Sequence, residues 1–289
     1  MLLMEHCSAI MRLVKGLLER CVEVTELMAG GAGPHRLSDI AQALDLPKSA
    51  AHRLLRELCA QGWMAQDGAD GPYRLTLRFG LLGHRVLQRT GLVDLTQPLV
   101  QLLANRTHEL ARLTVVTGNG ATSRGAATGS GLVWVGSAQG APPGLVYQPA
   151  MDGPLLLHAT ANGKAFLATL DDAAALRLAH DGGLGSRRPT PHTLADDAAL
   201  LADLAKIRAR GYAVADQEAE LGVTAVAVAV SGAGGPPLGR AVGTVSVAGP
   251  SLRLPARRIG DLVNALNETA AALAAVWPTR VRDKETIQA

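Results

Sequence analysis

Aromatic residues, paired cysteines and long apolar runs are all scarce in this sequence. Aromatics make up only 3% of the 289 residues, so Val, Leu and Ala must supply most of any core. The three cysteines, Cys7, Cys21 and Cys59, have no CxxC spacing, and no histidine pair stands near them at the spacing of metal ligands. The sequence therefore predicts neither a disulfide framework nor a metal site, and reduced thiols fit a cytoplasmic protein.

Membrane and secretion signals are missing as well. No apolar run approaches the roughly 20 residues that a membrane span requires. Glu5 and His6 interrupt the apolar start that a signal peptide would need. We therefore expect a soluble, cytoplasmic protein that does not enter a membrane, and its length suggests two domains with enough chain for a sizeable core.

Charge of one sign is not in large excess either. The formal net charge of +3 is too small to indicate nucleic-acid binding by itself. Its distribution is uneven, because residues 36–90 hold eight Lys and Arg against five Asp and Glu, whereas residues 91–289 hold seventeen against sixteen. The positive excess therefore lies in one N-terminal segment.

That segment contains the pattern of two short amphipathic helices joined by a tight turn, from Arg36 to Trp63. We expect Ser38 to cap the first helix, and Pro47 to end it and open the second, because the residue before a proline is pushed out of the α region. Apolar residues at i, i+3, i+4 and i+7 of the second helix share one face: Ala51, Leu54, Leu55 and Leu58. Polar and basic residues form the opposite face: Lys48, Ser49, His52, Arg53 and Arg56.

Two helices in this arrangement are typical of a helix-turn-helix, whose second helix enters the major groove of DNA. Residues 63–66 and 73–75 can form a hairpin around turn residues 67–72, which predicts a wing with Arg74 placed to meet a phosphate. The alternative is an ordinary surface helix whose cations are solvated. The order of helix, turn, helix and hairpin favours binding to double-stranded DNA.

The remaining chain mixes helical and strand periodicities. Helices are predicted at 9–29, 78–91, a segment opening near Pro98, 160–170, 172–180, 196–210 and 255–277. Strands are predicted at 113–117, 132–136, 223–231 and 240–248, the last two alternating strictly as half-buried antiparallel strands should. Gly-rich turns are expected at 118–120 and 129–131, and a loop at 232–237. This order indicates an α+β domain after an N-terminal DNA-binding domain.

Three stretches resemble the IclR family of bacterial transcription regulators. They are LSDIAQALDLPKSAAHRLLRELCAQGW followed by YRLTLRFGLLG, then MDGPLLLHATANGKAFLA, then GYAVADQEAELGVTAVAVAV with TVSVAGP. The resemblance spans roughly residues 10–277 and implies four parts. These are a winged helix-turn-helix domain at 8–77, a linker helix at 78–91 that either contributes to dimerisation or is only a spacer, a GAF-like effector-binding domain at 92–277, and a tail at 278–289. It also implies a homodimer, often a homotetramer.

The DNA-binding residues that we expect are Ser38, Lys48, Ser49, His52, Arg53, Arg56 and Arg74. Ser38 has an alternative role as a helix cap only. Which of these side chains touches a base and which a phosphate does not follow from spacing. Ala50 or Ala51 stands where the family often has threonine, which can change the DNA sequence that is read.

The resemblance further implies an effector pocket. Its expected lining residues are Tyr147, Leu155, Ala161, Asn162, Val223, Ala225, Ser246 and Ala248. Residues 160–163 open a helix whose free N–H groups can bind a carboxylate. The sequence departs from the family pattern where alanine replaces a polar residue, at Ala215, Ala225 and Ala248. We hypothesise that the ligand is larger or more apolar than a small keto acid, such as an aromatic or branched carboxylate. Alternatively, these alanines simply pack the core.

An enzymatic function is the weakest of three candidates. Asp216, Glu218, Glu220 and His158 could supply an acid and a base, but no nucleophile elbow, phosphate-binding loop or metal-spaced cluster accompanies them. We expect no catalytic residues and no cofactor. A second rival is a DNA-binding module whose C-terminal domain only oligomerises. The expected function is a regulator that binds operator DNA with an affinity modulated by a small-molecule effector.

Overall fold

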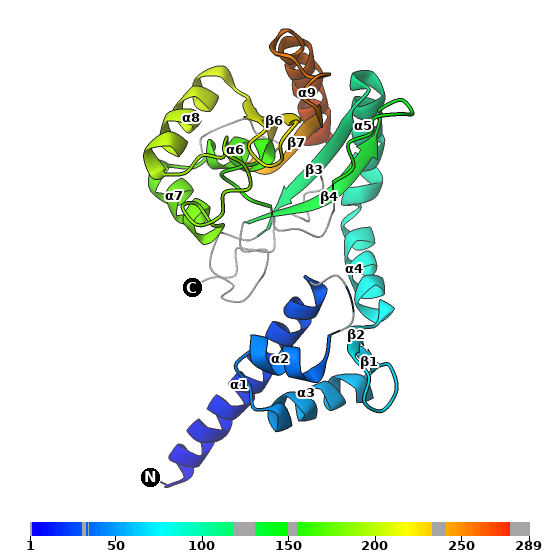
Figure 1. Ribbon diagram of the computed structural model, residues 1–289, viewed down its shortest axis with the longest axis vertical. Helices are drawn as coiled ribbons and strands as arrows, with labels where there is room; N and C mark the ends of the chain where they lie inside the picture. The colour runs from blue at the N-terminus through cyan, green and yellow to red at the C-terminus, as the bar shows by residue number, and fades with distance from the viewer. Residues whose placement is uncertain are drawn as a thin grey trace. The chain divides into compact units, whose positions relative to one another are not determined.

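The computed structural model describes residues 2–30, 33, 35–117, 131–149, 155–232 and 241–277, with side chains from residue 16 onward. The expected turns at 118–120 and 129–130, the loop at 233–237, the start of the MDGP stretch and the tail at 278–289 lie outside these ranges. The chain forms two compact units that divide within one helix, between Val86 and Leu87 (Figure 1).

The first unit contains the predicted helices and hairpin. Its elements are α1 (Leu2–Ala29), α2 (Leu37–Ala43), α3 (Lys48–Ala60), β1 (Met64–Gln66), β2 (Tyr73–Leu75) and the first part of α4 (Leu77–Thr90). The strands β1 and β2 pair antiparallel, with Ala65 opposite Arg74. A small core joins these elements: Val24, Met28, Ile40, Leu54, Leu55, Met64 and Tyr73. The helix-turn-helix and the hairpin after it are therefore confirmed.

The cap predicted for the first of the two short helices is wrong. α2 begins at Leu37, and Arg36 is its N-cap residue with an extended backbone. Ser38 is thus the second helical residue, and its hydroxyl donates to the Asp39 carboxylate at 3.0 Å instead of accepting a backbone N–H. The reason is packing, because Leu37 joins the core of the unit and the helix begins where that side chain must turn inward.

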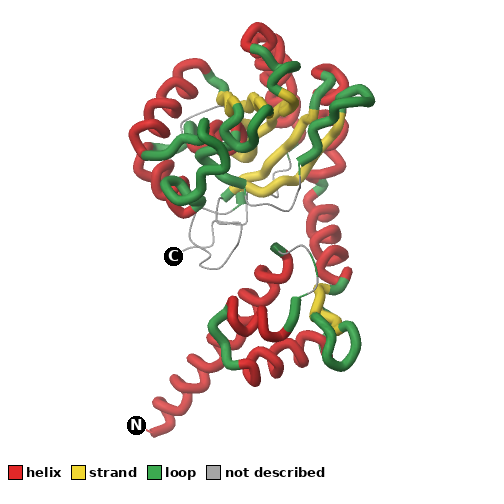
Figure 2. The backbone as a smooth tube through the Cα atoms, in the orientation of Figure 1, coloured by secondary structure: helices red, strands yellow, loops and turns green. Residues whose placement is uncertain are grey.

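The second unit is built on a five-stranded antiparallel sheet with the order β4-β3-β7-β6-β5. Its strands are β3 (Leu110–Val116), β4 (Leu132–Gln139), β5 (Ala213–Asp216), β6 (Val223–Ser231) and β7 (Ala241–Pro250). Helices α5 (Leu92–Thr107) and α9 (Ala256–Val276) cover one face of this sheet. The helix α6 (Ala161–Leu167) lies on the other face, beside α7 (Asp172–Asp181) and α8 (Asp197–Arg210), as Figure 2 shows. The α+β class is confirmed.

Three expectations for this unit need correction. α5 begins at Leu92, so Pro98 lies inside the helix rather than near its start. The strand β5 has only four residues and was not predicted. The strand β7 is buried on both faces instead of one, because helices cover both sides of the sheet. In each case, packing over long sequence distances overrides a short local pattern.

Neither membrane spans nor metal clusters occur in the part of the chain that the structure describes. No described helix is long and apolar enough to cross a bilayer. No group of three potential ligands is gathered closely enough among the described residues to hold a metal ion. Cys21 and Cys59 are both free thiols, and burial raises the pKa of each above its ordinary value.

Candidate nucleic-acid interface and effector site

The second helix of the helix-turn-helix, α3, separates its residues cleanly by burial. Ala51, Leu54 and Leu55 are no more than 5% exposed and pack into the core of the first unit. Five of the seven residues predicted for DNA contact are exposed on α3: Lys48, Ser49, His52, Arg53 and Arg56. The helix begins directly after Pro47, whose fixed φ suits that position. One face of α3 therefore anchors the helix while the other presents donors and cations to solvent.

The wing presents one further cation. Arg74 on β2 is exposed, and its Nε donates to the Asp67 carboxylate at 3.2 Å across the hairpin. The Gln66 amide donates to the carbonyls of Ala69 and Gly71 at 3.1 Å each, which fixes the shape of the turn. Because the Arg74–Asp67 pair is exposed, it is weak and can exchange for a phosphate.

A contact that sequence reasoning missed ties α4 to the end of α3. The Arg78 guanidinium lies 4.3 Å from the centre of the Trp63 ring and donates to the Gln61 carbonyl. The Trp63 ring also packs against Phe79, with ring centres 4.7 Å apart. In the sequence, Arg78 was only the first residue of the helix predicted at 78–91. Its neighbour Phe79 and the nearby Trp63 were the signal that a stacked cluster forms here.

The predicted effector residues gather on the α6 side of the large sheet. Side chains alternate between faces along each strand, and Val223, Ala225, Ser246 and Ala248 all share the face that α6 covers. From α6 itself, Ala161 is 1% exposed and Asn162 is 3% exposed. Leu155, just before α6, is buried among the same side chains, and Tyr147 lies in the segment after β4.

The three alanines that replace polar family residues form one continuous row. Ala248 on β7 pairs in register with Ala225 on β6, which pairs in turn with Ala215 on β5. Pairs that lie directly opposite each other on neighbouring strands point to the same face. The row therefore offers three adjacent methyl groups on the α6 side of the sheet.

A polar row runs beside these alanines. Asn162 donates to the Thr244 hydroxyl at 2.9 Å, and that hydroxyl lies 2.6 Å from the hydroxyl of Thr114. Ser246, one pleat farther along β7, is paired in register with Arg112 on β3. A patch of buried hydroxyls, an amide and a guanidinium thus interrupts an otherwise apolar face, and such patches confer binding specificity where they meet a ligand.

Arg112 was not singled out from the sequence, although it is the one charge within the apolar run LARLTVV. Only 7% of the residue is exposed, and its guanidinium lies 4.0 Å from the centre of the Trp134 ring. Burial lowers the pKa of Arg112 from its ordinary value, and the nearby Tyr147 raises it by a smaller amount. A lone arginine in a strand with covered faces is the signal that could have found it.

Tyr147 is held across the edge of this face. Its hydroxyl hydrogen-bonds with the Glu220 carboxylate, and its backbone carbonyl accepts from the Gln139 amide at 2.9 Å. Burial and the Glu220 charge raise the pKa of Tyr147 to about 12, so the phenol stays protonated at neutral pH. Since Gln139 ends β4 and Glu220 precedes β6, Tyr147 spans the two strands that lie between them, β3 and β7.

The anion-binding helix end predicted at 160–163 is not supported. The Thr160 side chain accepts the Gly163 N–H at 3.2 Å, so a group expected to bind an anion is already paired. α6 has only seven residues. A full helix dipole cannot develop over so short a segment, because it sums the dipoles of successive peptide units.

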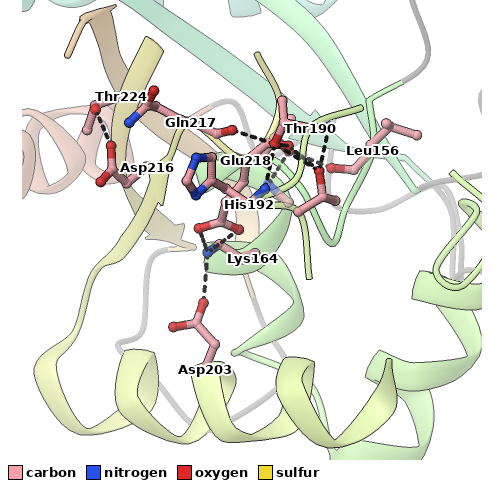
Figure 3. Close-up of polar contacts among 12 residues, drawn as sticks. Leu156, Lys164, Thr190, His192, Asp203, Asp216, Gln217, Glu218 and Thr224 are labelled. Carbon is pink, nitrogen blue, oxygen red and sulfur yellow. Dashed lines mark hydrogen bonds and ion pairs between the residues drawn. The ribbon is translucent and has the colours of Figure 1, made fainter. Parts of the chain in front are cut away.

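Each candidate catalytic group forms a polar contact with a different partner, as Figure 3 shows for Glu218 and Asp216. Glu218 accepts from the Lys164 ammonium at 2.7 and 2.8 Å, and Asp216 accepts from the Thr224 hydroxyl at 2.8 Å. His158 is fully buried, and its Nε2 lies 2.9 Å from the Arg187 carbonyl oxygen. Burial lowers the pKa of His158. Each group thus has a separate structural partner.

Comparisons with known proteins match both units. Residues 17–68 match the family model described as the IclR helix-turn-helix domain, and residues 150–275 match the one described as the bacterial transcriptional regulator IclR C-terminal domain. The HTH-type transcriptional regulator BhcR of Paracoccus denitrificans is 31% identical over 89% of this chain and 85% of its own length.

Solved structures match the same range. A putative IclR transcriptional regulator from a Silicibacter species aligns with a TM-score of 0.75 at 21% identity, over 92% of this chain and 96% of that one. An IclR homologue from Microbacterium hydrocarbonoxydans, solved in complex with 4-hydroxybenzoate, aligns with a TM-score of 0.67 at 24% identity, over 92% and 99% of the two chains. The curated relatives are named as transcriptional regulators and repressors.

Proposed function

We propose that this chain, which belongs to the IclR family of bacterial transcriptional regulators, binds operator DNA with an affinity that a small organic acid changes. The observation that carries the proposal is the division of α3. Its buried face fixes the helix in the first unit, and its exposed face presents Lys48, Arg53 and Arg56. A helix of this kind reads base edges in the major groove, while cations around it bind phosphates.

The contacts to DNA follow from position on α3 and the wing. Residues near the N-terminus of a recognition helix reach base edges, so Lys48, Ser49 and His52 are our candidates for reading bases. Arg53 and Arg56 lie farther along the helix, and Arg74 is on the wing, where phosphates come within reach of long side chains. Ser38 lies on the preceding helix and contacts the backbone of the DNA.

The effector that we propose is an aromatic or branched carboxylate. The row of Ala215, Ala225 and Ala248 supplies apolar surface, and Ser246 and Asn162 supply polar groups beside it. The complex of a structural neighbour with 4-hydroxybenzoate is in keeping with an aromatic acid. A thermal-shift panel in which only two- and three-carbon acids stabilise the protein would contradict this ligand class.

Regulation works through linkage between the effector and DNA. An effector that binds one arrangement of the protein more tightly increases its population, and operator affinity changes by the same coupling free energy. We further propose that the chain acts as a homodimer, with a homotetramer as the larger form. Support comes from α4, which has no buried residue along its 14 positions although Leu82 and Val86, which lie on one side of the helix, are apolar. A two-fold dimer matches a palindromic operator.

The test measures binding of the full chain to the intergenic DNA beside its own gene, at fixed salt, with and without a library of carboxylates. Tight binding that one acid strengthens or weakens is the expected result. No preference for this DNA over bulk competitor would contradict the role in operator binding. Specific binding that no compound alters would instead favour the rival, a DNA-binding module whose C-terminal unit only oligomerises.

A further inference from the structure

A cavity of about 260 Å³ lies between α5 and α9, on the face of the sheet opposite to the predicted effector residues. The two helices lie side by side on that face (Figure 1). The last turn of α5 contributes Arg106 and Thr107 to the lining. One face of α9 contributes the rest: Arg258, Asp261, Leu262, Asn264 and Ala265. The volume is just below the roughly 300–1,000 Å³ of most ligand pockets, so the cavity suits a small metabolite.

The floor of this cavity is apolar and its rim is polar. Leu262 and Ala265 are each 2% exposed and belong to the core beneath α5 and α9. The other side chains at the opening are exposed: Arg106, Asp261 and Asn264. A ligand therefore meets apolar surface below it and charged or amide groups around it, which is the usual composition of a small-molecule site.

Arg258 is a positioned cation at one side of the cavity. Its Nη1 donates to the Arg253 carbonyl at 2.9 Å, and its Nη2 donates to the Thr107 carbonyl at 3.0 Å. These two bonds occupy only part of the guanidinium, which carries five N–H donors, and 35% of the side chain is exposed. Glu109 Oε1 lies 3.9 Å from Nη1, but both Glu109 oxygens already accept from Arg253. A carboxylate is the group that matches the remaining donors.

Asp261 carries the opposite charge, three residues farther along α9. Residues at this spacing are neighbours on a helix surface, so an ion pair between Arg258 and Asp261 would be ordinary. It does not form, because Arg258 is turned toward the two carbonyls. Among the residues that the structure describes, Asp261 has no hydrogen-bond or ion-pair partner. Its carboxylate is therefore available to a cation in the cavity.

The third charge in the lining is already balanced. Arg106 on α5 donates to both carboxylate oxygens of Glu268 on α9, and this pair bridges the two helices. One cation and one anion of the lining are left without a counter-ion that is exclusively theirs: Arg258 and Asp261. A ligand that carries one charge of each sign would pair with both, whereas a simple anion or a simple cation would pair with one and be repelled by the other.

We propose that this cavity binds a small zwitterion of the α-amino acid class, with its carboxylate at Arg258 and its ammonium at Asp261. Both charged groups of an α-amino acid are attached to one carbon, and the two protein residues are about 4.5 Å apart along the helix axis. The ligand side chain lies against Leu262 and Ala265, and the Asn264 amide can donate or accept at the rim. This is a second site, independent of the proposed effector on the other face of the sheet.

The experiment measures binding to the full chain by calorimetry, with glycine, L-alanine, L-serine, L-valine and L-asparagine as probes. Each is compared with its N-acetyl form, which lacks the cation, and with its primary amide, which lacks the anion. The variants are Arg258→Gln, Asp261→Asn and Asn264→Trp, the last of which places a large ring at the opening without removing a charge. Arg257→Gln and Asp181→Asn are the matched controls, because they remove the same charges from exposed positions outside the lining.

We expect at least one amino acid to bind, and both of its blocked forms to bind much more weakly. Arg258→Gln and Asp261→Asn should each lower its affinity by roughly 10-fold or more, because each removes a hydrogen bond between charged groups. In Asp261→Asn the N-acetyl form should bind as well as the free amino acid, and in Arg258→Gln the amide should. Asn264→Trp should abolish binding, and both controls should resemble the natural chain.

Thermal melts without ligand check that each variant is folded. If Arg258→Gln does not fold, because it also loses the two carbonyl contacts, Arg258→Lys replaces it: the charge remains without the paired donors, so binding should still weaken. The inference is overturned if no amino acid binds, or if a blocked form binds as tightly as its free amino acid. It is also overturned if Asn264→Trp leaves the affinity unchanged, or if the controls weaken binding as much as Arg258→Gln and Asp261→Asn do.

Discussion

The Lys164 ammonium donates to both carboxylate oxygens of Glu218, at 2.7 and 2.8 Å, while only 1% of the Lys164 side chain is exposed. Asp203 on α8 lies 2.8 Å from the same nitrogen (Figure 3). Burial nevertheless raises the pKa of Glu218, because desolvation outweighs the attraction of the ammonium. One cation on α6 thus pairs with two carboxylates that come from different parts of the second unit.

Removal of that cation should be strongly destabilising. In Lys164→Met two partly buried carboxylates lose their counter-ion, so we expect the free energy of unfolding to fall by about 3–5 kcal/mol. Urea denaturation followed by circular dichroism measures the change. Lys206→Met is the matched control, because Lys206 is exposed on α8 and its loss should change stability by no more than about 0.5 kcal/mol. Equal stability of the two variants would contradict the structural role of Lys164.

Replacement by alanine should change the stability of the protein in opposite directions at two helical glycines. A Cβ on Gly163 would lie 2.4 Å from the carbonyl oxygen of Leu157, a backbone atom that cannot move aside easily. Gly163→Ala should therefore destabilise the protein by about 1–3 kcal/mol. Gly260 on α9 has open space around it, so Gly260→Ala should stabilise by about 0.5–1 kcal/mol. Paired thermal melts test both, and a stabilising Gly163→Ala would show that α6 is not pressed against residues 155–157.

The loss of protein stability at acidic pH should depend on His158. Burial lowers the pKa of this ring in the folded protein, so below about pH 6.5 the unfolded chain binds a proton that the folded chain does not. Stability then falls as pH decreases from 6.5 toward the folded pKa, with a slope of at most about 1.4 kcal/mol per pH unit. Urea titrations between pH 7.5 and 5 should show a flatter profile for His158→Gln. His192→Gln, at an exposed site, is the matched control.

The sequence predicted the DNA-binding unit well because its signals are local. Leu54 and Leu55 are buried, and Arg53 and Arg56 are exposed, as a helical period of 3.6 requires. The error at Ser38 came from a cap preference that the packing of Leu37 overrode. Helix caps depend on one or two residues, so a single buried side chain can move them.

The second unit was predictable in class but not in its contacts. Ala215, Ala225 and Ala248 could be named one at a time, whereas their alignment in one row depends on strand register across residues far apart in sequence. The pairing of Lys164 with Glu218 likewise joins positions 54 residues apart. Arg112 was overlooked because the sequence pattern was searched for apolar faces. A single charged residue only interrupts the apolar pattern of a strand.

The apolar side of α4 should control assembly. Leu82 is 48% exposed and Val86 is 56% exposed in the single chain, and two Glu residues in their place would bury charge in the proposed dimer. We expect Leu82→Glu, Val86→Glu to halve the mass measured by light scattering and to weaken operator binding. Gln88→Glu is the control, because a turn of 3.6 residues places it away from Leu82 and Val86. An unchanged mass in the double variant would remove α4 from the dimer interface.

The salt dependence of DNA binding should show whether Arg56 on α3 contacts a phosphate. Each cation that meets a phosphate releases a condensed counter-ion, so the slope of log K against log salt counts such contacts. Arg56→Ala should weaken operator binding and reduce that slope by about 1. Arg177→Ala is the matched control, since it removes the same charge from an exposed position on α7 in the other unit. Fluorescence anisotropy between about 50 and 200 mM salt measures the slope for each variant. If Arg56→Ala and Arg177→Ala alter the slope equally, the effect is one of net charge and the exposed face of α3 does not form the DNA interface.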